Sequence, residues 1–560
     1  MPSANPAADS DRPRRLHFDA IVIGSGMSSM ATASLLSRLR GQRVLMLEQH
    51  YIMGGFTHEF SRMHKGRRFH WDVGVHYIGD MQPDSILRKI FDRVTGGGVE
   101  WAPMPRERFE RFVYPDLSID VPADEIEYRR VLIERFPDEQ NAIDQYFRDI
   151  KKINAWFGQH FMKSGSAFID RARAPLRINN FRSVDISTAE YMDRNFSDPR
   201  LKAVLTSRWP DYGVPPSRSS FLVHATVDCH YLAGGYFPVG GAGAIAAAIR
   251  PLIEAPGGEI RLAHRVEEIL VADGRAVGVR ARNLRARKSQ GDEELVEAFA
   301  PVIISGAGVY NTYERMLPAS VDVAFRAALR DFYLRERPAS AVTAYCALKV
   351  DPREAGFEFQ GENHWFYCDY DADRVFANGV DWLAGRTDLR WAYLSFPSLK
   401  NPQAKHHTAE IIVIADDQAF APWRDTTSWK RRTPDYEKLK DKIAGDLLAL
   451  IEARHPGFAE IVERVEVSTP LSVEHFSRHP AGAVYGLPCV PERFRSKESP
   501  WCAIASPVLP GLYLTGVDVC PSGVGGALLS AIGTTMQLPA KLGFGEVLRA
   551  GAAVSGKATL

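Results

Sequence analysis

The chain has 560 residues, 45% of them hydrophobic and 24% charged, and its net charge is +1. These proportions are those of an ordinary folded enzyme, and they argue against wholesale disorder and against a multispanning membrane protein. A near-neutral charge offers no basic face for phosphates, so we expect no nucleic-acid partner. The six cysteines lie far apart without a C-x-x-C pair, and no spacing predicts a metal site.

The N-terminal segment 1–16 is polar, and it lacks the apolar core of a secretory signal. We expect a disordered lead-in there. No stretch approaches the roughly 20 apolar residues that span a bilayer. The sequence therefore predicts a cytoplasmic protein whose contact with a membrane would be peripheral.

A β-α-β unit follows the lead-in. Residues 19–24 form a short apolar run that predicts a strand buried on both faces. Residues 28–39 show helical spacing, and Gly41 predicts the end of that helix. A second apolar run, Val44 to Leu47, ends at Glu48.

The loop between the first strand and the helix, Gly24-Ser25-Gly26-Met27-Ser28-Ser29, has the pattern of a dinucleotide fingerprint. Its first glycine permits the tight turn, and its second lets the backbone approach a pyrophosphate that rests on the free N–H groups of the helix. The third glycine position holds Ser29, a small residue that we expect to be tolerated. Glu48 ends the second strand, where a carboxylate can accept ribose hydroxyls and would repel a 2′-phosphate. Together these residues predict a dinucleotide site.

The middle of the chain predicts further units. Residues 111–220 contain helical segments rich in arginine and aromatic residues, which we interpret as an insertion. Residues 259–279 predict a small sheet with a turn at Asp273-Gly274, and residues 301–305 predict a strand that returns to the core. Apolar runs between residues 335 and 475 predict a second, mainly antiparallel sheet.

A second glycine-rich corner lies near the C-terminus. Gly511-Leu-Tyr-Leu-Thr-Gly516-Val-Asp518 predicts a strand ending in Gly-x-Asp, and Gly523-Val-Gly525-Gly526 then opens an apolar helix. With the doublet Gly54-Gly55, this arrangement resembles large FAD-dependent oxidoreductases of the amine oxidase and phytoene desaturase type. The resemblance implies that the doublet passes close to the pyrophosphate and ribityl group, and that Asp518 hydrogen-bonds the same region. It also implies that the N-terminus of the last helix stabilises the anionic reduced flavin.

Further motifs narrow the resemblance. Phe69-His-Trp-Asp72-Val-Gly74-Val-His76-Tyr77-Ile-Gly79 resembles the retinol saturase and carotenoid isomerase branch of the phytoene desaturase superfamily. Phe237-Pro-Val-Gly240-Gly241-Ala-Gly243, Ser305-Gly-Ala-Gly308 and Pro480-Ala-Gly482-Ala-Val-Tyr485-Gly486 match in the expected order. The resemblance implies that His76 and Tyr77 lie near the reactive face of the flavin, and that the substrate lies along Gly240, Gly241 and Gly243. The FAD-binding residues that it implies are Gly24, Gly26, Met27, Ser28, Glu48, Gln49, Gly54, Gly55, Phe56, Thr57, Val266, Gly306, Gly516, Asp518, Gly525, Gly526 and Ala527.

The segment Gly306-x-Gly308 lacks both a following helix pattern and a downstream acid. We therefore predict no separate NAD(P) site. With a single dinucleotide site, electrons must enter or leave through the substrate, a diffusing carrier or a partner protein.

The predicted fold is α/β: a Rossmann-type FAD-binding domain, discontinuous in sequence, with an α+β substrate domain that carries a mainly antiparallel sheet. The predicted boundaries are 1–16 for the lead-in, 17–110, 221–332 and 481–545 for the FAD-binding domain, 111–220 for a helical insertion facing substrate or membrane, 333–480 for the substrate sheet and 546–560 for a tail.

We predict that the protein is an FAD-dependent oxidoreductase that saturates, or isomerises with redox assistance, a carbon–carbon double bond in a long apolar substrate of isoprenoid, carotenoid or retinoid type. One alternative is a desaturase of a polyene or lipid that uses oxygen or quinone. Another is a flavin-containing carrier without catalysis. Saturation needs a proton donor, for which His76, Tyr77 and Tyr485 are candidates.

Two more clusters have competing interpretations. Asp228-Cys229-His230, if it lies on a strand, points its side chains to opposite faces and forms no joint site. The second cluster forms either an amphipathic entrance on a membrane or a helix packed on the core, and it comprises Trp156, Phe157, Phe161, Met162, Phe168 and Ile169 with Arg171, Arg173 and Arg177.

Overall fold

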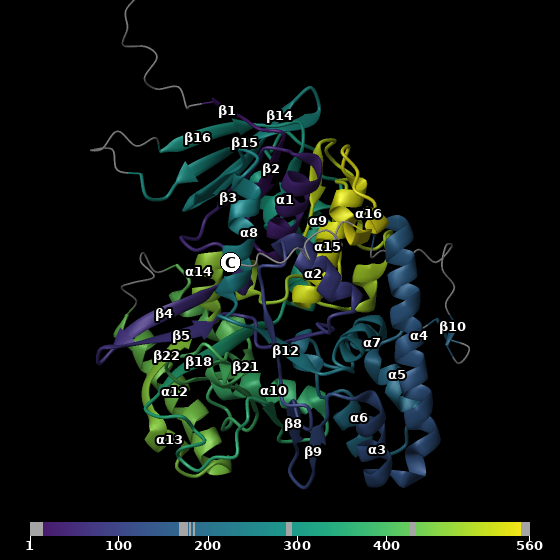
Figure 1. The fold of residues 1–560 in the computed structure, drawn as a ribbon, viewed down its shortest axis with the longest axis vertical. Coiled ribbons are helices and arrows are strands. Elements are labelled where there is room, and N and C mark those ends of the chain that lie inside the picture. The colour runs from purple at the N-terminus through teal and green to yellow at the C-terminus, as the bar shows by residue number, and fades with distance from the viewer. Residues whose placement is uncertain are drawn as a thin grey trace, which may run out of the picture.

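A computed structural model describes residues 15–166, 177–178, 181–182, 185–286, 294–425 and 433–549. Two large sheets organise the described chain. A five-stranded sheet lies in the upper half of Figure 1, and a seven-stranded sheet lies in the lower half. The predicted α/β fold with an additional, mainly antiparallel sheet is confirmed.

The five-stranded sheet is parallel throughout and contains the predicted β-α-β unit. Its second and third strands are buried along their whole length, as expected for strands covered on both faces. Helix α1 (Met27–Arg40) joins them and ends at Gly41, whose φ of 61° is left-handed. The strand order is β13 (Glu259–Leu262), β3 (Val44–Glu48), β2 (Ala20–Ile23), β17 (Ile303–Ser305) and β23 (Leu512–Leu514).

Strand β13 corrects one prediction. Residues 259–262, predicted to join a small sheet with the segment that follows, pair instead with β3 at the edge of the parallel sheet. Ala263 has a φ of 57°, and this turn lets consecutive strands enter different sheets.

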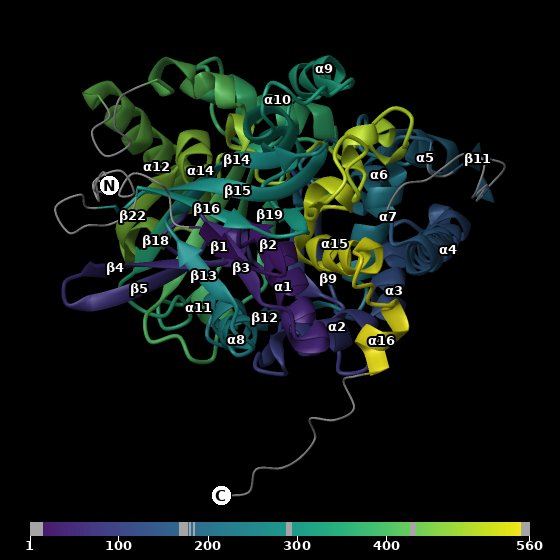
Figure 2. The same ribbon diagram turned by 90° about the horizontal axis from the view of Figure 1, so that it is seen from above.

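The two faces of the parallel sheet carry different layers (Figure 2). Helices α1, α8 (Gly243–Glu254) and α15 (Gly523–Gln537) lie on one face. The other face carries the sheet of β1 (Arg15–His17), β16 (Leu295–Phe299), β15 (Arg275–Asn283) and β14 (His264–Ala272). Residues 15 and 16, predicted to lie in a disordered lead-in, therefore belong to a strand that pairs with β16.

The seven-stranded sheet is antiparallel except where β19 meets β8. Its order is β22 (Val462–Ser468), β18 (Ser340–Leu348), β21 (Thr408–Ala415), β20 (Ala392–Ser395), β19 (Asn363–Phe366), β8 (Glu110–Val113) and β9 (Ser118–Val121). The predicted helical insertion thus begins with two strands of this sheet. Those strands are short and include charged residues at positions 110, 111 and 120, so their pattern does not resemble that of a buried sheet.

Helices of the insertion stand beside this sheet at the right of Figure 1. They are α3 (Glu125–Arg135), α4 (Gln140–Ser164), α5 (Thr188–Asn195) and α6 (Pro199–Leu205). Helix α7 (Phe221–His230), which begins just after the predicted end of the insertion, packs against α4. Residues 228–230 end α7, so the strand assumed for them is wrong. In α4, Phe157 and Phe161 are buried, which favours packing on the core, whereas the side chains at 168, 169, 171, 173 and 177 of the same predicted cluster lie outside the described residues.

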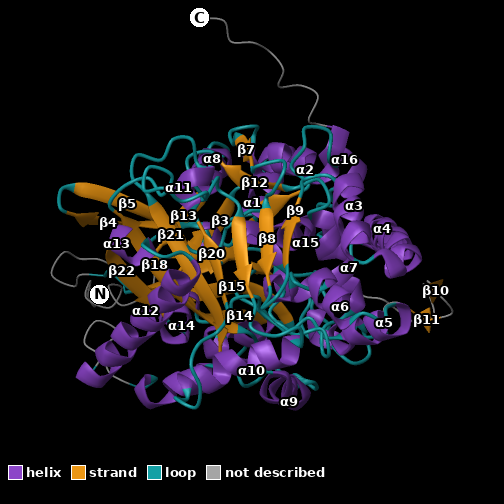
Figure 3. Cartoon of the chain, turned by 90° about the horizontal axis from the view of Figure 1, so that it is seen from below, coloured by secondary structure: helices purple, strands orange, loops and turns teal. Residues whose placement is uncertain are grey.

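Smaller elements complete the described chain (Figure 3). The strands form a hairpin, a three-stranded sheet and a two-stranded pair, and they are β4 (Glu59–His64), β5 (Arg67–Asp72), β6 (Ile78–Gly79), β12 (Gly235–Pro238), β7 (Trp101–Pro103), β10 (Arg177–Ile178) and β11 (Phe181–Arg182). The helices are α2 (Ile86–Thr95), α9 (Arg326–Glu336), α10 (Ala372–Leu383), α11 (Pro397–Lys400), α12 (Pro434–Arg454), α13 (Phe458–Ile461), α14 (Pro470–Ser477) and α16 (Phe544–Arg549). Helix α16 extends into the predicted C-terminal tail. Among the described helices, none combines the length and apolar character needed to cross a bilayer.

Candidate functional site

A cavity of about 800 Å³ lies where the carboxyl ends of the parallel strands meet the seven-stranded sheet. Ligands of open α/β sheets bind at such strand ends. The ends of β2, β3, β17 and β23 form one part of its wall, and other parts come from loops and from β4, β14, β18, β22, α1, α12, α14 and α15. Both predicted glycine-rich corners therefore open into one space.

Most of the predicted binding residues line this cavity. They are Gly24, Gly26, Met27, Ser28, Glu48, Gln49, Gly55, Phe56, Thr57, Val266, Gly306, Gly516, Asp518 and Ala527, together with the candidate proton donor Tyr485. Gly54, Gly525 and Gly526 are next in the chain to residues of the wall. The contacts of all these residues with a cofactor stay predictions.

The first corner is built by glycines in close contact. Gly24 has a φ of 89° and Gly55 a φ of 56°, conformations that favour glycine. A Cβ on Gly55 would lie 2.8 Å from the Cα of Gly26, so the doublet crosses directly over the fingerprint loop. The departure at the third glycine position has a local compensation. A Cβ on Gly306 would lie 2.0 Å from the hydroxyl of Ser29, so glycine in the neighbouring strand end makes room for the serine.

The Glu48 carboxylate is buried at the end of β3. One oxygen accepts hydrogen bonds from the Ser25 backbone N–H at 2.7 Å and from its hydroxyl at 2.8 Å, and the other accepts from the His50 N–H at 2.7 Å. Burial raises the pKa of Glu48, and these three hydrogen bonds oppose the rise. Glu48 also lines the cavity, where its carboxylate can meet a hydroxyl group.

Two helices begin at the cavity wall. Neither α1, which starts after Gly26, nor α15, which starts after Ser522, has a side-chain hydrogen bond at its N-cap or an acidic residue in its first turn. Their free N–H groups and positive dipole ends are therefore available to anionic groups.

Asp518 joins three separate segments of the wall. Its two carboxylate oxygens accept the backbone N–H groups of Val309 and Leu487, each at 2.8 Å. The chain passes so close that a Cβ on Gly486 would lie 2.3 Å from the carboxylate. Asp518 thus holds the second corner in place through contacts within the protein.

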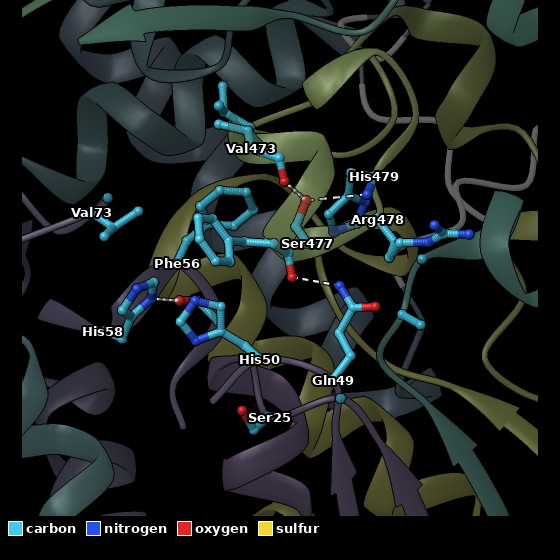
Figure 4. Close-up of a pocket in the computed structure, with 18 of the residues that line it drawn as sticks. Ser25, Gln49, His50, Phe56, His58, Val73, Val473, Ser477, Arg478 and His479 are labelled. Carbon is cyan, nitrogen blue, oxygen red and sulfur yellow. Dashed lines mark hydrogen bonds between the residues drawn. The ribbon is translucent and has the colours of Figure 1, made fainter. Parts of the chain in front are cut away.

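Helix α14 covers the end of β3, as Figure 4 shows. The Gln49 side-chain amide donates to the carbonyl of Phe476 at 2.5 Å. The ring of His50 lies 4.7 Å from that of Phe476 and 4.4 Å from that of Tyr51. No local pattern in the sequence predicts this contact, because its two partners are separated by most of the chain.

The His50 ring predicts a dependence of stability on pH. Its Nδ1 accepts the Ile52 N–H at 2.9 Å, and burial, with the nearby His58, lowers its pKa from 6.5 to about 4. The unfolded chain therefore binds a proton between pH 6.5 and 4 that the folded chain does not, so stability falls as the pH falls through this window. We expect His50 to contribute about 2 kcal/mol to the loss between pH 7 and pH 5, measured by denaturant unfolding.

The variant His50→Asn isolates this effect, because asparagine can accept the same N–H two residues on but does not titrate. We expect a smaller loss on acidification in this variant. The control His70→Asn changes an exposed histidine and should retain the wild-type loss. Equal losses in wild type and His50→Asn would contradict the prediction.

Apolar and aromatic side chains line the same cavity as the glycine corners. They are Phe56, Phe60, Val73, Tyr345, Val473, Val484 and Tyr485. Two partly exposed ion pairs, Arg62 with Glu466 at 3.0 Å and Lys440 with Glu437 at 3.5 Å, also line the wall and indicate its solvent side. These side chains come from segments that are distant in sequence, so no single motif predicts that they meet.

Some predicted residues lie elsewhere. Among the described residues, none from 75 to 263 lines the cavity, which excludes His76, Tyr77 and the substrate glycines from its wall. His76 Nδ1 lies 2.9 Å from the Glu410 carboxylate, and the Tyr77 hydroxyl bonds carboxylates of Glu110 and Asp211. At Gly241 and Gly243, an added Cβ would meet the Glu59 side chain at 2.5 and 3.0 Å, so these glycines admit that side chain. Their contacts with flavin or substrate stay predictions.

Comparison with known proteins agrees with the fold. Residues 22–94 match the family model of an NAD(P)-binding Rossmann-like domain. All-trans-retinol 13,14-reductase of Rattus norvegicus is 31% identical over 534 residues, 92% of this chain and 84% of that protein. The chloroplastic prolycopene isomerase 2 of an Oncidium hybrid cultivar is 25% identical over 544 residues, which cover 94% of this chain and 84% of that protein. A solved structure of wild-type putrescine oxidase bound to putrescine has a TM-score of 0.57 at 14% identity, covering 92% of this chain and 98% of that one, a likeness of fold alone.

Proposed function

From the fact that this chain belongs to the family of the all-trans-retinol 13,14-reductases, we propose that it is an FAD-dependent oxidoreductase that saturates a carbon–carbon double bond in a long polyene of the retinoid or carotenoid type. The observation that carries the proposal is the lining of the cavity. One space is lined both by the two glycine-rich corners and by a group of apolar and aromatic side chains. A cofactor and a polyene can therefore meet without bulk water between them.

The residues present fit FAD. The helix N-termini of α1 and α15 are open to its diphosphate and flavin, and the close crossing of Gly55 over Gly26 leaves the loop backbone accessible. Glu48 lines the cavity, where its carboxylate can meet a ribose hydroxyl. The two corners face one cavity, which suits a long dinucleotide that spans both. Bound FAD supplies the electron pair for reduction of an alkene.

The protein's own contribution is binding, orientation and exclusion of water. Helix α14 covers the β3 end of the cavity through Gln49 and Phe476. Phe60 and Tyr345, whose rings meet at 4.8 Å with an interplanar angle of 87°, offer a rigid aromatic wall to a flat polyene.

Redox-assisted isomerisation is the second candidate, because the Oncidium relative is a prolycopene isomerase. Desaturation and a carrier role without catalysis complete the set of candidate functions. Reduced protein should be mixed anaerobically with retinoids and carotenoids, and the masses of the products measured by mass spectrometry. Saturation adds two hydrogens, isomerisation leaves the mass unchanged and desaturation removes two. A flavin spectrum that no polyene changes, despite binding, would support the carrier role.

The cofactor assignment is tested by Glu48→Ala. We expect about tenfold weaker FAD binding, because a hydrogen bond to a charged group contributes about 1.5 to 3 kcal/mol. Cofactor released from the purified protein is identified by chromatography, and affinity is measured by titrating the apoprotein. The control Glu437→Ala removes a carboxylate that lies at the cavity wall on α12 and should bind FAD normally. Unchanged affinity in Glu48→Ala would remove the ribose contact from the proposal.

A further inference from the structure

A buried network of charges lies outside the cavity wall. The Arg208 guanidinium lies 2.7 Å from the carboxylate of Glu110 on β8 and 3.2 Å from that of Asp228 on α7. The Tyr77 hydroxyl lies 2.8 Å from Glu110 Oε1 and 2.7 Å from Asp211 Oδ2. The network ties the helical insertion to the seven-stranded sheet, and the proposed function makes no use of it.

The Tyr77 hydroxyl has one hydrogen but two carboxyl groups at hydrogen-bond distance. A tyrosine hydroxyl carries one hydrogen, so it can donate to only one of the two carboxyl groups. The second contact, at hydrogen-bond distance, requires a hydrogen on the carboxyl group. One of the two acids is therefore protonated when both contacts are made.

The surroundings decide which acid holds the hydrogen. Glu110 already accepts from donors on both oxygens, since Trp365 Nε1 lies 2.9 Å from Oε1 and the Arg208 Nε lies 2.7 Å from Oε2. A group that accepts only from donors is stabilised as a carboxylate. Within the described residues, Asp211 has no cationic side chain within 4 Å and no hydrogen-bond partner on its second oxygen. Burial and then the charge of Glu110 raise the pKa of Asp211 to about 7.

Asp211 does not line the cavity, but it lies close to a residue that does. It ends a short 3-10 turn, and an added Cβ on Gly213 would lie 2.9 Å from the Tyr485 ring. Tyr485 therefore packs against backbone two residues beyond Asp211, and Tyr485 lines the cavity. Burial raises the pKa of Tyr485, and Asp211 raises it further, which indicates that the two groups are close.

We propose that Asp211 is a protonated carboxylic acid in the resting protein, donates its hydrogen bond to Tyr77, and holds the proton that saturation of the substrate consumes. Protonation of Asp211 and its bond to Tyr77 do not depend on the proposed function, whereas use of the proton rests on it. Saturation breaks the π bond and forms two C–H bonds, one with the hydrogen and electron pair taken from the reduced cofactor and one with a proton. Because Asp211 does not line the cavity, the proton passes through the hydroxyl of Tyr485, which gives its own hydrogen to the substrate and takes that of Asp211. Asp211 is then a carboxylate, to which Tyr77 can donate, and water returns the proton.

The first experiment detects the acid directly, without substrate. Infrared spectra of the resting holoprotein in H₂O and D₂O should contain a carboxylic acid carbonyl band that is lost in Asp211→Asn, whose amide can still donate to Tyr77. Tyr77→Phe should keep the band but shift its frequency, because the acid loses its hydrogen-bond acceptor. This variant tests the assignment if Asp211→Asn does not fold. The matched control is Asp116→Asn. Asp116 also accepts a hydrogen bond from a tyrosine, Tyr370, but in the described structure it has no contact with the network around Arg208. An unchanged band in both test variants would overturn the assignment.

The second experiment follows oxidation of the reduced holoprotein by a polyene in single turnover. Asp211→Asn should react at least about a hundredfold more slowly, which is the usual effect of removing a general acid, and should lose the solvent isotope effect. Asp116→Asn should react like wild type. If Asp211→Asn loses the infrared band but reacts at the wild-type rate, Asp211 is protonated but does not supply the proton for saturation. A wild type that reduces no polyene would overturn the proposed function and with it the proton's use, while the band would still decide whether Asp211 is protonated.

Discussion

Gly55→Ala is expected to weaken cofactor binding by about a hundredfold or more. The new Cβ would lie 2.8 Å from the Cα of Gly26, a backbone atom of the fingerprint loop that cannot rotate away. The loop must shift as a whole, and with it the N–H groups that open α1. Crowding of this kind costs about 1 to 3 kcal/mol in a packed site, and the left-handed φ of 56° adds about 1 to 2 kcal/mol. The measurement is FAD affinity of the refolded apoprotein, with the thermal midpoint recorded alongside.

Gly66→Ala separates the clash from the backbone strain. Gly66 has a φ of 77° in the turn between β4 and β5, and an added Cβ there would meet nothing within 4 Å. This variant should lose about 1 to 2 kcal/mol of stability and keep the wild-type affinity for FAD. If both variants bound FAD equally well, the close crossing of the two loops would have no part in cofactor binding.

Arg208→Met is expected to destabilise the folded protein strongly. The guanidinium is buried between Glu110 and Asp228, and methionine would fill much of its volume but leave two carboxylates without their cation. Breaking a buried ion pair from one side costs about 3 to 5 kcal/mol. We expect a clear fall in the denaturation midpoint and in the yield of folded protein.

Two further variants test the cause of that loss. Arg130→Met removes an arginine that bonds Glu127 and Glu134 on the exposed face of α3, and it should cost less than about 1 kcal/mol. Glu110→Gln added to Arg208→Met should recover part of the lost stability, because one uncompensated charge is removed. A loss in Arg208→Met no larger than that in Arg130→Met would mean that the buried acids take up protons at little cost.

The sequence is sufficient to predict the parts of the fold that local rules govern. The β-α-β unit from β2 to β3 follows from two buried apolar runs, a helical spacing and a glycine stop, all within a short segment. The second corner, from β23 to α15, follows from the same kind of local pattern. The tolerance of serine at position 29 is different, because the residue that leaves room for its hydroxyl, Gly306, is close in space but distant in sequence.

The rest cannot be predicted from the sequence, because it depends on which distant segments meet. Nothing near Gln49 indicates that α14 will cover it, and nothing in a charged strand such as β8 indicates a place inside a sheet. The motif around Tyr77 predicts a proton donor but not the groups that surround it. Its partners Glu110 and Asp211 come from separate elements, and only their meeting shows that one acid must hold a hydrogen.

The attachment of Asp518 to Val309 and Leu487 has a consequence for biosynthesis. The ribosome delivers the fingerprint loop first and the closing corner near the very end, so a nascent chain holds only half of the binding wall for most of its translation. We therefore expect the chain to take up its cofactor only after residue 518 has been synthesised. We expect a chain that terminates before residue 518 to keep its first glycine loop and to lose its affinity for the nucleotide.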